Sequence, residues 1–120
     1  MSYDKGQVVL VPFPFADLTA AKQRPALIIS SKSYNDAHAE VVIIAITSQV
    51  PASIPPEEYL LSPEEQKAAG LPKQSLVKTG KIFAIDKRQI RKSLGIFPDK
   101  TSPDKTIRQI EERLRKIIDF

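Results

Sequence analysis

The sequence has no cysteine among its 120 residues and only one histidine, His38. Without cysteine, neither a disulfide framework nor a thiolate metal site is available, and this composition fits a reducing cytoplasm. A single histidine also argues against a structural zinc site. We therefore expect neither a thiolate metal site nor a structural zinc site, and we also expect the protein to work without a cofactor.

Long apolar runs are also missing. No run approaches the roughly 20 residues of a membrane span, and the first residues, Met1 to Gly6, lack the basic stretch and apolar core of a signal peptide. Neither internal repeats nor low-complexity tracts divide the chain. We expect one domain over residues 1–120 that is located in the cytoplasm and does not associate with membranes.

Charge is distributed unevenly along the chain. Up to Pro72 there are 5 basic and 8 acidic residues, which gives −3, whereas from Lys73 onward 13 basic and 6 acidic residues give +7. A basic half of this kind attracts phosphates and favours a polyanionic partner. The alternative is a solvated, lysine-rich surface without a specific ligand.

Short apolar runs rich in β-branched residues predict most of the secondary structure. A strand pair is expected at 8–15 and 24–30, so that Arg24 stands at the base of the connecting loop, where a rigid scaffold can direct it at whatever the loop covers. Gly80 would permit a bulge or bend between two later strands. The other predicted strands are 41–46, 59–61, 75–79 and 81–85.

Helix signals are fewer. Residues 62–65 read Ser-Pro-Glu-Glu, a capping box that predicts a brief helix stopped by Gly70. A longer C-terminal helix should begin with Ser102 as its N-cap and Pro103 in its first turn. An apolar stripe would pack this helix against the sheet, and its members are Ile107, Ile110, Leu114, Ile117 and Ile118.

Two further segments are read as turn or loop. Asp86 is expected to cap a helical turn that ends at Gly95, and His38 is expected in a polar loop over residues 33–38. Many short strands with one long terminal helix predict a mainly β fold of the α+β class. Its core would be a small, strongly bent antiparallel sheet or partly open barrel and not a parallel α/β sheet.

An ordered set of motifs carries a family resemblance. The motifs are Gly6–Phe15, Arg24–Ser30, Ile46–Ser48, Gly70–Lys78 and Lys81–Phe83. Together they resemble the MazF/PemK toxin family over most of the chain, from Gly6 to about Phe97. The resemblance implies an SH3-like barrel with a C-terminal helix, usually as a homodimer. It also implies a toxin of a toxin-antitoxin system that cleaves single-stranded RNA without a metal ion and is silenced by a cognate antitoxin protein.

Three residues fit the chemistry of metal-free RNA cleavage, in which the ribose 2′-hydroxyl attacks the adjacent phosphate. Arg24 matches the family's essential arginine, and its guanidinium presents a fork to two phosphate oxygens. Thr47 matches the family's threonine and could donate a hydrogen bond to a phosphate oxygen. Lys78 would hold phosphate as a point charge. Each of the three also has a purely structural alternative. Arg24 could be solvated, because the proline after it favours extended backbone. Thr47 could satisfy backbone groups of a loop, and Lys78 could protect a strand edge from pairing.

The remaining candidates would line an RNA groove. The aromatic ring of Phe15 could stack on an unpaired base, although core packing is the alternative. The predicted RNA-binding residues are Phe15, Asp17, Lys22, Ser48, Gln49 and Lys81. The antitoxin is expected to compete for the same groove with an acidic, partly disordered segment.

The sequence departs from the family pattern at two positions. Many relatives carry acids where this chain has Gln7 and Gly80, so the general base is unassigned. Arg24 is a poor candidate because a guanidinium does not readily lose its proton, and Asp17 is a possible substitute. Two other functions stay open: a protein-targeting toxin resembling the gyrase poison CcdB, and a catalytically silent relative that only binds RNA.

Overall fold

A computed structural model of the protein describes residues 2–12, 23–97 and 105–120. Within these residues the strands pair antiparallel in one six-stranded sheet of order β4-β5-β3-β2-β1-β6. The strands are β1 (Gln7–Pro12), β2 (Gln23–Ile28), β3 (Glu40–Thr47), β4 (Tyr59–Leu60), β5 (Leu76–Asp86) and β6 (Lys92–Ile96). The helical elements are α1 (Lys32–Ala37), α2 (Pro63–Ala68), the 3-10 turn η1 (Lys87–Gln89) and α3 (Lys105–Leu114).

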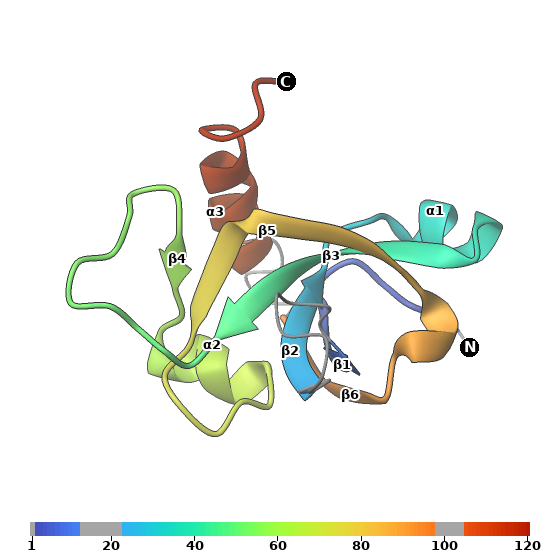
Figure 1. The fold of residues 1–120 in the computed structure, drawn as a ribbon, viewed down its shortest axis with the longest axis horizontal. Helices are drawn as coiled ribbons and strands as arrows, with labels where there is room; N and C mark the ends of the chain where they lie inside the picture. The colour runs from blue at the N-terminus through green and yellow to red at the C-terminus, as the bar shows by residue number, and fades with distance from the viewer. Residues whose placement is uncertain (1, 13–22, 98–104) are drawn as a thin grey trace.

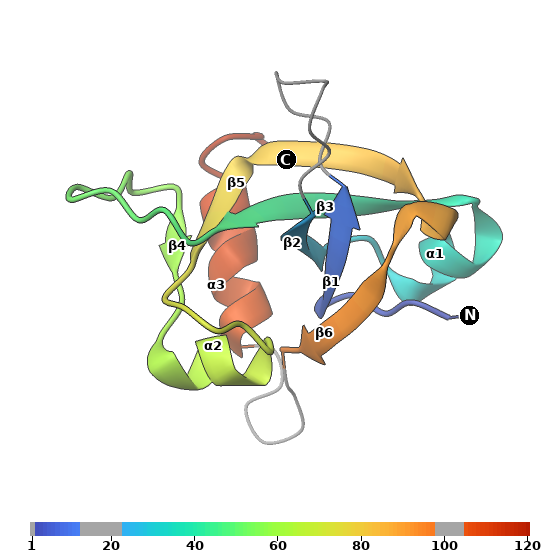
Figure 2. The ribbon, with the colours of Figure 1, turned by 60° about the horizontal axis from the view of Figure 1, so that its bottom comes forward.

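The sheet is strongly bent. The long strands β3 and β5 run side by side across the molecule, with α3 against the β4–β5 end and α1 near the opposite end (Figure 1). Figure 2 shows β1 and β6 turned steeply away from β3 and β5, so that the sheet curls. The predicted α+β fold, a small bent antiparallel sheet with a C-terminal helix, is confirmed.

Alternation along the strands divides the buried side chains between two apolar clusters, because successive residues of a strand point to opposite faces of the sheet. On β3, Ile44 and Ile46 belong to the first cluster, which also contains Ile110 and Leu114 of α3. Ile43 and Ala45 belong to the second cluster. Both faces of β3 are therefore buried, which explains why this strand is apolar at nearly every position.

Strand β5 is a single bent strand and not the predicted pair. Ala45 pairs with Lys78 and Ile44 pairs with Ile82, so residues 79–81 are extra residues on β5 at this point. This confirms the predicted bulge at Gly80. A bulge bends the strand that contains it, and residues 75–85 therefore follow the curl of the sheet without a turn.

The segment after β5 differs from the predicted helical turn. Asp86 caps η1 as expected, by accepting a hydrogen bond from the backbone N–H of Arg88 at 2.8 Å. The turn ends at Gln89, however, and Lys92–Ile96 is strand β6, which pairs with β1. The prediction of a helical turn up to Gly95 was wrong because this segment forms backbone hydrogen bonds with the edge of β1 that faces away from β2.

Residues 32–37 form α1 where a polar loop was predicted, and His38 is its C-cap. The reason is a tertiary contact. The buried Asn35 amide donates hydrogen bonds to the carbonyl oxygens of Tyr3 at 3.0 Å and Ser30 at 3.1 Å. A polar side chain thus fixes the helix, and such a contact leaves no apolar periodicity in the sequence.

The predicted helix caps and the predicted apolar stripe are confirmed in part for α2 and α3. The Ser62 and Glu65 capping box of α2 is present, and Gly70 follows with a φ of 72°. Ser102 and Pro103 lie outside the described residues. In α3 the expected Ile110 and Leu114 are buried. The stripe is shorter than predicted because the helix ends at Leu114, and Ile117 and Ile118 are 42% and 45% exposed.

Candidate functional site

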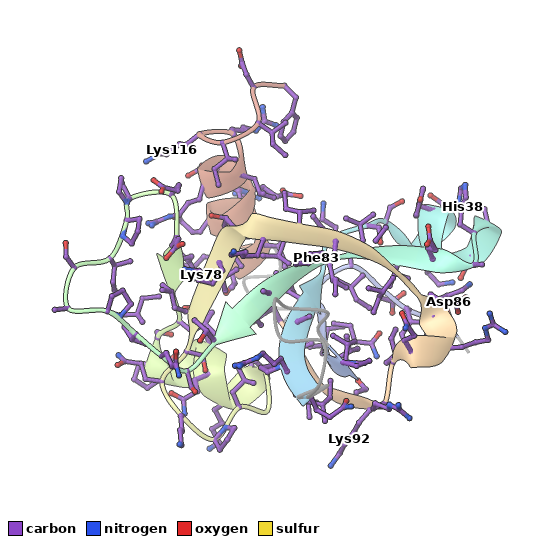
Figure 3. The ribbon with its side chains drawn as sticks, in the orientation of Figure 1. His38, Lys78, Phe83, Asp86, Lys92 and Lys116 are labelled. Carbon is purple, nitrogen blue, oxygen red and sulfur yellow. The ribbon has the colours of Figure 1, made fainter. Side chains whose placement is uncertain are left out.

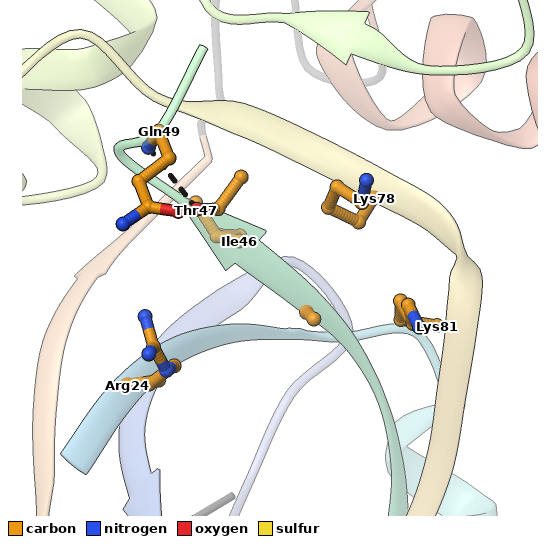
Figure 4. Close-up of a pocket in the computed structure, with 7 residues that line it drawn as sticks. Arg24, Ile46, Thr47, Gln49, Lys78 and Lys81 are labelled. Atoms are coloured by element: carbon orange, nitrogen blue, oxygen red, sulfur yellow. Dashed lines mark hydrogen bonds between the residues drawn. The ribbon is translucent and has the colours of Figure 1, made fainter. Parts of the chain in front are cut away.

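A pocket of about 260 Å³ opens between β2, the end of β3 and β5. Figure 4 shows Arg24 on β2 directed toward the end of β3, where Thr47 and Gln49 lie, with Lys78 and Lys81 on β5. The described residues that line this pocket are Arg24, Ala45, Ile46, Thr47, Gln49, Lys78 and Lys81.

Strand register explains why residues so far apart in the sequence meet here. Ala26 of β2 pairs with Ala45 of β3, and Arg24 and Thr47 each lie two residues beyond this pair on their strands. Ala45 also pairs with Lys78 of β5. Since opposed residues and residues two apart share a face, the arginine, the threonine and the lysine project from one face of the sheet.

The shape of the pocket depends on the small side chain of Ala45 and on the bulge of β5. Ala45 contributes only a methyl group to the lining, between the longer side chains of β2 and β5. Lys81 belongs to the three extra residues of the bulge, so both it and Lys78 line the same pocket despite their spacing of three. A regular strand would send residues three apart to opposite faces.

The hydroxyl of Thr47 is hydrogen-bonded to the backbone of the following residues. Its Oγ1 accepts a hydrogen bond from the backbone N–H of Gln49 at 3.1 Å, drawn as a dashed line in Figure 4. A hydroxyl that accepts one bond retains its own hydrogen for donation. Thr47 is therefore arranged to donate to an oxygen of a ligand in the pocket.

The pocket is strongly cationic. Arg24, Lys78 and Lys81 line it, and no carboxylate is among the described lining residues. Lys78 Nζ forms an ion pair with Glu58 Oε2 at 3.2 Å. Guanidinium and ammonium groups with a hydroxyl donor suit a phosphate, which accepts hydrogen bonds at several oxygens.

Most of the predicted site residues that the structure describes meet at this pocket. Arg24, Thr47, Gln49, Lys78 and Lys81 all line it. Ser48 is exposed but is not among the lining residues. The other predicted RNA-binding residues, which are Phe15, Asp17 and Lys22, lie outside the described residues.

Two features of the site were missed in the sequence. Ala45 contributes to the lining, yet an alanine in an apolar run carries no signal of a binding role. Glu58 contacts Lys78 from 20 residues away, and the pairing of β4 with β5 brings these two segments together. The one sequence signal for this contact was the adjacent acidic pair Glu57 and Glu58 after the proline-rich stretch.

The two departures from the family pattern fall in different places. Gln7 is engaged elsewhere: its amide donates to Ser93 Oγ at 2.8 Å and accepts from the Asp4 N–H at 3.2 Å. Gly80 lies in the bulge between the two pocket lysines, and a Cβ there would meet only Ile117 Cδ1, at 3.9 Å. A carboxylate would therefore be accommodated next to the pocket at position 80.

Two negative findings concern the described residues 2–12, 23–97 and 105–120 alone. They contain no group of three or more histidine, aspartate or glutamate side chains arranged to hold a metal ion. They also contain no helix that is long and apolar enough to cross a membrane.

Comparisons with known proteins agree with the fold. The family model described as "PemK-like, MazF-like toxin of type II toxin-antitoxin system" matches residues 4–118. The crystal structure of MazF (Form-I) from Deinococcus radiodurans is similar, with a TM-score of 0.75 and 21% identity over 100% of this chain and 99% of that chain. No curated protein sequence matches the chain.

Two mycobacterial structures are also similar. An endoribonuclease in complex with its cognate antitoxin from Mycobacterial species has a TM-score of 0.71 and 19% identity over 96% of this chain and 93% of that chain. The Mycobacterium tuberculosis toxin MazF-mt6 has a TM-score of 0.70 and 17% identity over 95% of this chain and 97% of that chain. At these identities the structures support the fold.

Proposed function

Because the chain belongs to the PemK-like, MazF-like toxins of type II toxin-antitoxin systems, we propose that it is a metal-independent endoribonuclease that cleaves single-stranded RNA at the cationic pocket. The observation that supports the proposal most is the pocket, which is lined together by Arg24, Thr47 and Lys78. These groups match the needs of phosphate binding and of charge stabilisation at one place.

In the proposed reaction the ribose 2′-hydroxyl attacks its own 3′-phosphate. The new O–P bond closes a 2′,3′-cyclic phosphate as the bond to the 5′-oxygen breaks; the 2′-hydroxyl gives its proton to water, and the leaving 5′-oxygen takes one from water. Arg24 pairs with two non-bridging oxygens and stabilises the charge of the transition state. The Thr47 hydroxyl donates to the same phosphate, and Lys78 attracts it. We assign no general base, since no carboxylate is among the described lining residues.

Gln49 and Lys81 would contact the RNA on either side of the scissile phosphate. Gln49 is exposed at the end of β3 and carries an amide that can pair with a base edge. The exposed ammonium group of Lys81 would hold a second phosphate.

A cognate antitoxin and a second copy of the chain are the proposed protein partners. Similar solved structures include an endoribonuclease with its cognate antitoxin and a MazE-MazF complex from Deinococcus radiodurans. A cationic pocket is an appropriate target for an acidic segment that orders on binding. We place the activity in the cytoplasm, where the antitoxin and messenger RNA would both be available.

The test is cleavage of a long single-stranded RNA by purified protein in excess chelator. We expect discrete fragments that persist with chelator. Arg24→Ala should lower the cleavage rate by about 10²- to 10³-fold, because an essential donor to the transition state is removed. The matched control is Arg108→Ala, which removes an exposed arginine on α3 and should cleave at the wild-type rate.

Other outcomes would replace the proposal. Intact RNA that is nevertheless shifted in a gel would indicate a silent RNA-binding protein. Cleavage that stops with chelator would contradict metal independence. Inhibition of DNA supercoiling with intact RNA would indicate a gyrase poison resembling CcdB.

A further inference from the structure

A buried carboxylate lies behind one of the lysines of the pocket. Lys78 Nζ and Glu58 Oε2 are 3.2 Å apart, and their side chains are 34% and 11% exposed. Lys78 lines the pocket whereas Glu58 is not among its lining residues. In Figure 3 Lys78 lies on β5 between α3 and the end of β3. The acid thus touches the lysine without facing the ligand space.

The backbone around Glu58 is held in place from two sides. Arg113 of α3 donates from Nη1 to the carbonyl oxygens of Glu58 at 2.6 Å and Pro56 at 3.2 Å. Thr79 of the β5 bulge donates from Oγ1 to the carbonyl oxygen of Glu57 at 2.6 Å. These bonds fix the backbone at Glu58 beside α3 and β5, from which its side chain reaches Lys78.

Stability alone does not account for a carboxylate at this position. Glu58 Oε1 is buried and has no hydrogen-bond partner among the described residues. Burying a charged oxygen without a partner is costly, and Lys78, which is 34% exposed, would keep contact with water beside a neutral side chain. The negative charge has its evident effect on the lysine that it contacts.

We propose that Glu58 weakens the attraction of Lys78 for an RNA phosphate and so limits how tightly the pocket holds RNA. This inference rests on the proposed function. A phosphate on the open side of Lys78 is attracted by the ammonium and repelled by the carboxylate behind it, so the pair acts nearly as a dipole. Arg24 and Lys81 then supply most of the attraction. Weaker binding lets the cleaved fragments leave the pocket faster.

Four variants test this in a charge-matched set: Glu58→Gln, Lys78→Gln, the double variant and Glu40→Gln. Glu58→Gln keeps the shape and one acceptor but removes the charge. Glu40 is exposed at the start of β3, at the opposite end of the strand from Thr47, so its substitution controls for net charge. The probe is a fully 2′-O-methylated copy of the RNA cut in the cleavage assay, which cannot undergo 2′-hydroxyl attack.

We expect Glu58→Gln to bind this probe about two- to fivefold more tightly, since a partly exposed charge pair is worth that much. The slope of log Kd against log salt should steepen by up to about 0.7, the value for one added phosphate contact on a single strand. In the Lys78→Gln background Glu58→Gln should change Kd less than about 1.5-fold, because the lysine through which it acts is gone. Tm of Glu58→Gln should not fall.

Multiple-turnover cleavage gives a second readout. Glu58→Gln should lower the steady-state rate relative to the single-turnover rate, because product release slows. A merely structural role for Glu58 would instead lower Tm and the fraction of active enzyme without tightening Kd.

Several results would overturn the inference. Unchanged or weaker probe binding by Glu58→Gln contradicts it, as does tightening that persists with Lys78→Gln or that Glu40→Gln reproduces. If the wild type cleaves RNA and Glu58→Gln behaves identically, this inference alone fails. If the wild type neither binds nor cleaves RNA, the proposed function fails and this inference fails with it.

Discussion

At the scale of single residues, Thr47 shows most directly how the backbone prepares a side chain for chemistry. Its hydroxyl accepts the N–H of Gln49, which fixes Oγ1 at the end of β3 and leaves its hydrogen available. Serine preserves this arrangement, but alanine removes the donor and also the acceptor for the backbone N–H. The two substitutions therefore separate the hydroxyl from the methyl group.

We expect Thr47→Ala to lower the RNA cleavage rate by about 10²-fold and Thr47→Ser to retain most of it, since one donor to a developing charge contributes this much. Single-turnover kinetics with both variants measure the effect, and probe binding shows whether the phosphate is still held. Equal activity of Thr47→Ala and wild type would remove Thr47 from the proposed mechanism.

The sequence was sufficient to predict the residues that end regular strands. Arg24 and Thr47 stand at the ends of apolar runs that favour β structure, and antiparallel pairing brings such ends together. Glu58 could not be foreseen, because its contact with Lys78 depends on the pairing of β4 with β5 and on the bulge. Register and bulges are set by tertiary packing, which a single sequence does not display.

At the scale of elements, the end of α2 packs against β6 with almost no space between backbones. A Cβ at Gly95 of β6 would lie 2.7 Å from the carbonyl carbon of Ala69 and closer still to the Ala68 carbonyl oxygen. A Cβ at Gly70 would likewise collide with the Leu94 carbonyl. Helix and strand can approach this closely only because both positions lack a side chain.

Gly95→Ala should therefore lower the free energy of unfolding by about 3 kcal/mol or more, because the clash is with backbone that cannot rotate away. Gly80→Ala is the matched control, and its added methyl group has room, so a change below about 1 kcal/mol is expected. Urea unfolding monitored by circular dichroism measures both. Similar losses in the two variants would contradict the close approach.

The Glu65 carboxylate connects three elements. It accepts hydrogen bonds from Tyr59 Oη of β4 at 2.7 Å, Thr106 Oγ1 of α3 at 2.6 Å and the Ser62 N–H at 2.8 Å. Burial by itself would raise the pKa of Glu65, but these bonds favour the charged form and bring the pKa below its ordinary value. Burial and this carboxylate raise the pKa of Tyr59, which stays protonated as the donor.

Stability should therefore fall in acid. A carboxyl group with a lowered folded-state pKa stabilises the fold above its unfolded pKa, and this contribution is lost as the pH falls below about 4.5. Glu65→Gln retains the capping-box pattern, and at pH 7 it should cost about 1 kcal/mol, because Glu65 is partly exposed. Urea unfolding from pH 7 to pH 3 should show this difference shrinking in acid. Parallel curves would contradict it.

Element prediction succeeded where local chemistry decided the outcome. The capping box of α2 and the apolar run of β3 were both readable. Prediction failed for α1 and β6, where distant groups decide: the buried Asn35 amide fixes α1, and β6 completes the edge of β1. Both segments are polar enough to resemble loops when read alone.

At the scale of the whole molecule, the basic half of the chain contributes to the pocket through β5. Two basic residues from the C-terminal half of the chain, Lys78 and Lys81, line the pocket. They do so together with Arg24, which comes from the N-terminal half. Other basic residues of this half that the structure describes lie on η1, β6 and α3 and in the segments next to them. The charge asymmetry therefore indicated which half of the chain contributes two of the pocket's three cations, but not where the pocket lies.

RNA affinity should depend on salt to the extent set by these few contacts. Two to three phosphate contacts on a single strand imply that raising salt from 50 to 200 mM weakens binding roughly 10-fold. Fluorescence anisotropy with the 2′-O-methylated probe measures the slope. A change below twofold would show that the cationic pocket does not hold the RNA backbone.

The bulge of β5 contains residues that do not pair with β3, although the strand on either side of it does. Val77 and Ile82 on either side of it remain on the ladder with β3, paired with Ile46 and Ile44, whereas residues 79–81 pair with no residue of β3 in the register. Gly80 and Lys81 are exposed. If the pocket binds RNA as proposed, changes at these two positions would alter which RNA is preferred without disturbing the sheet, which makes the bulge a natural starting point for redirecting the specificity of the protein.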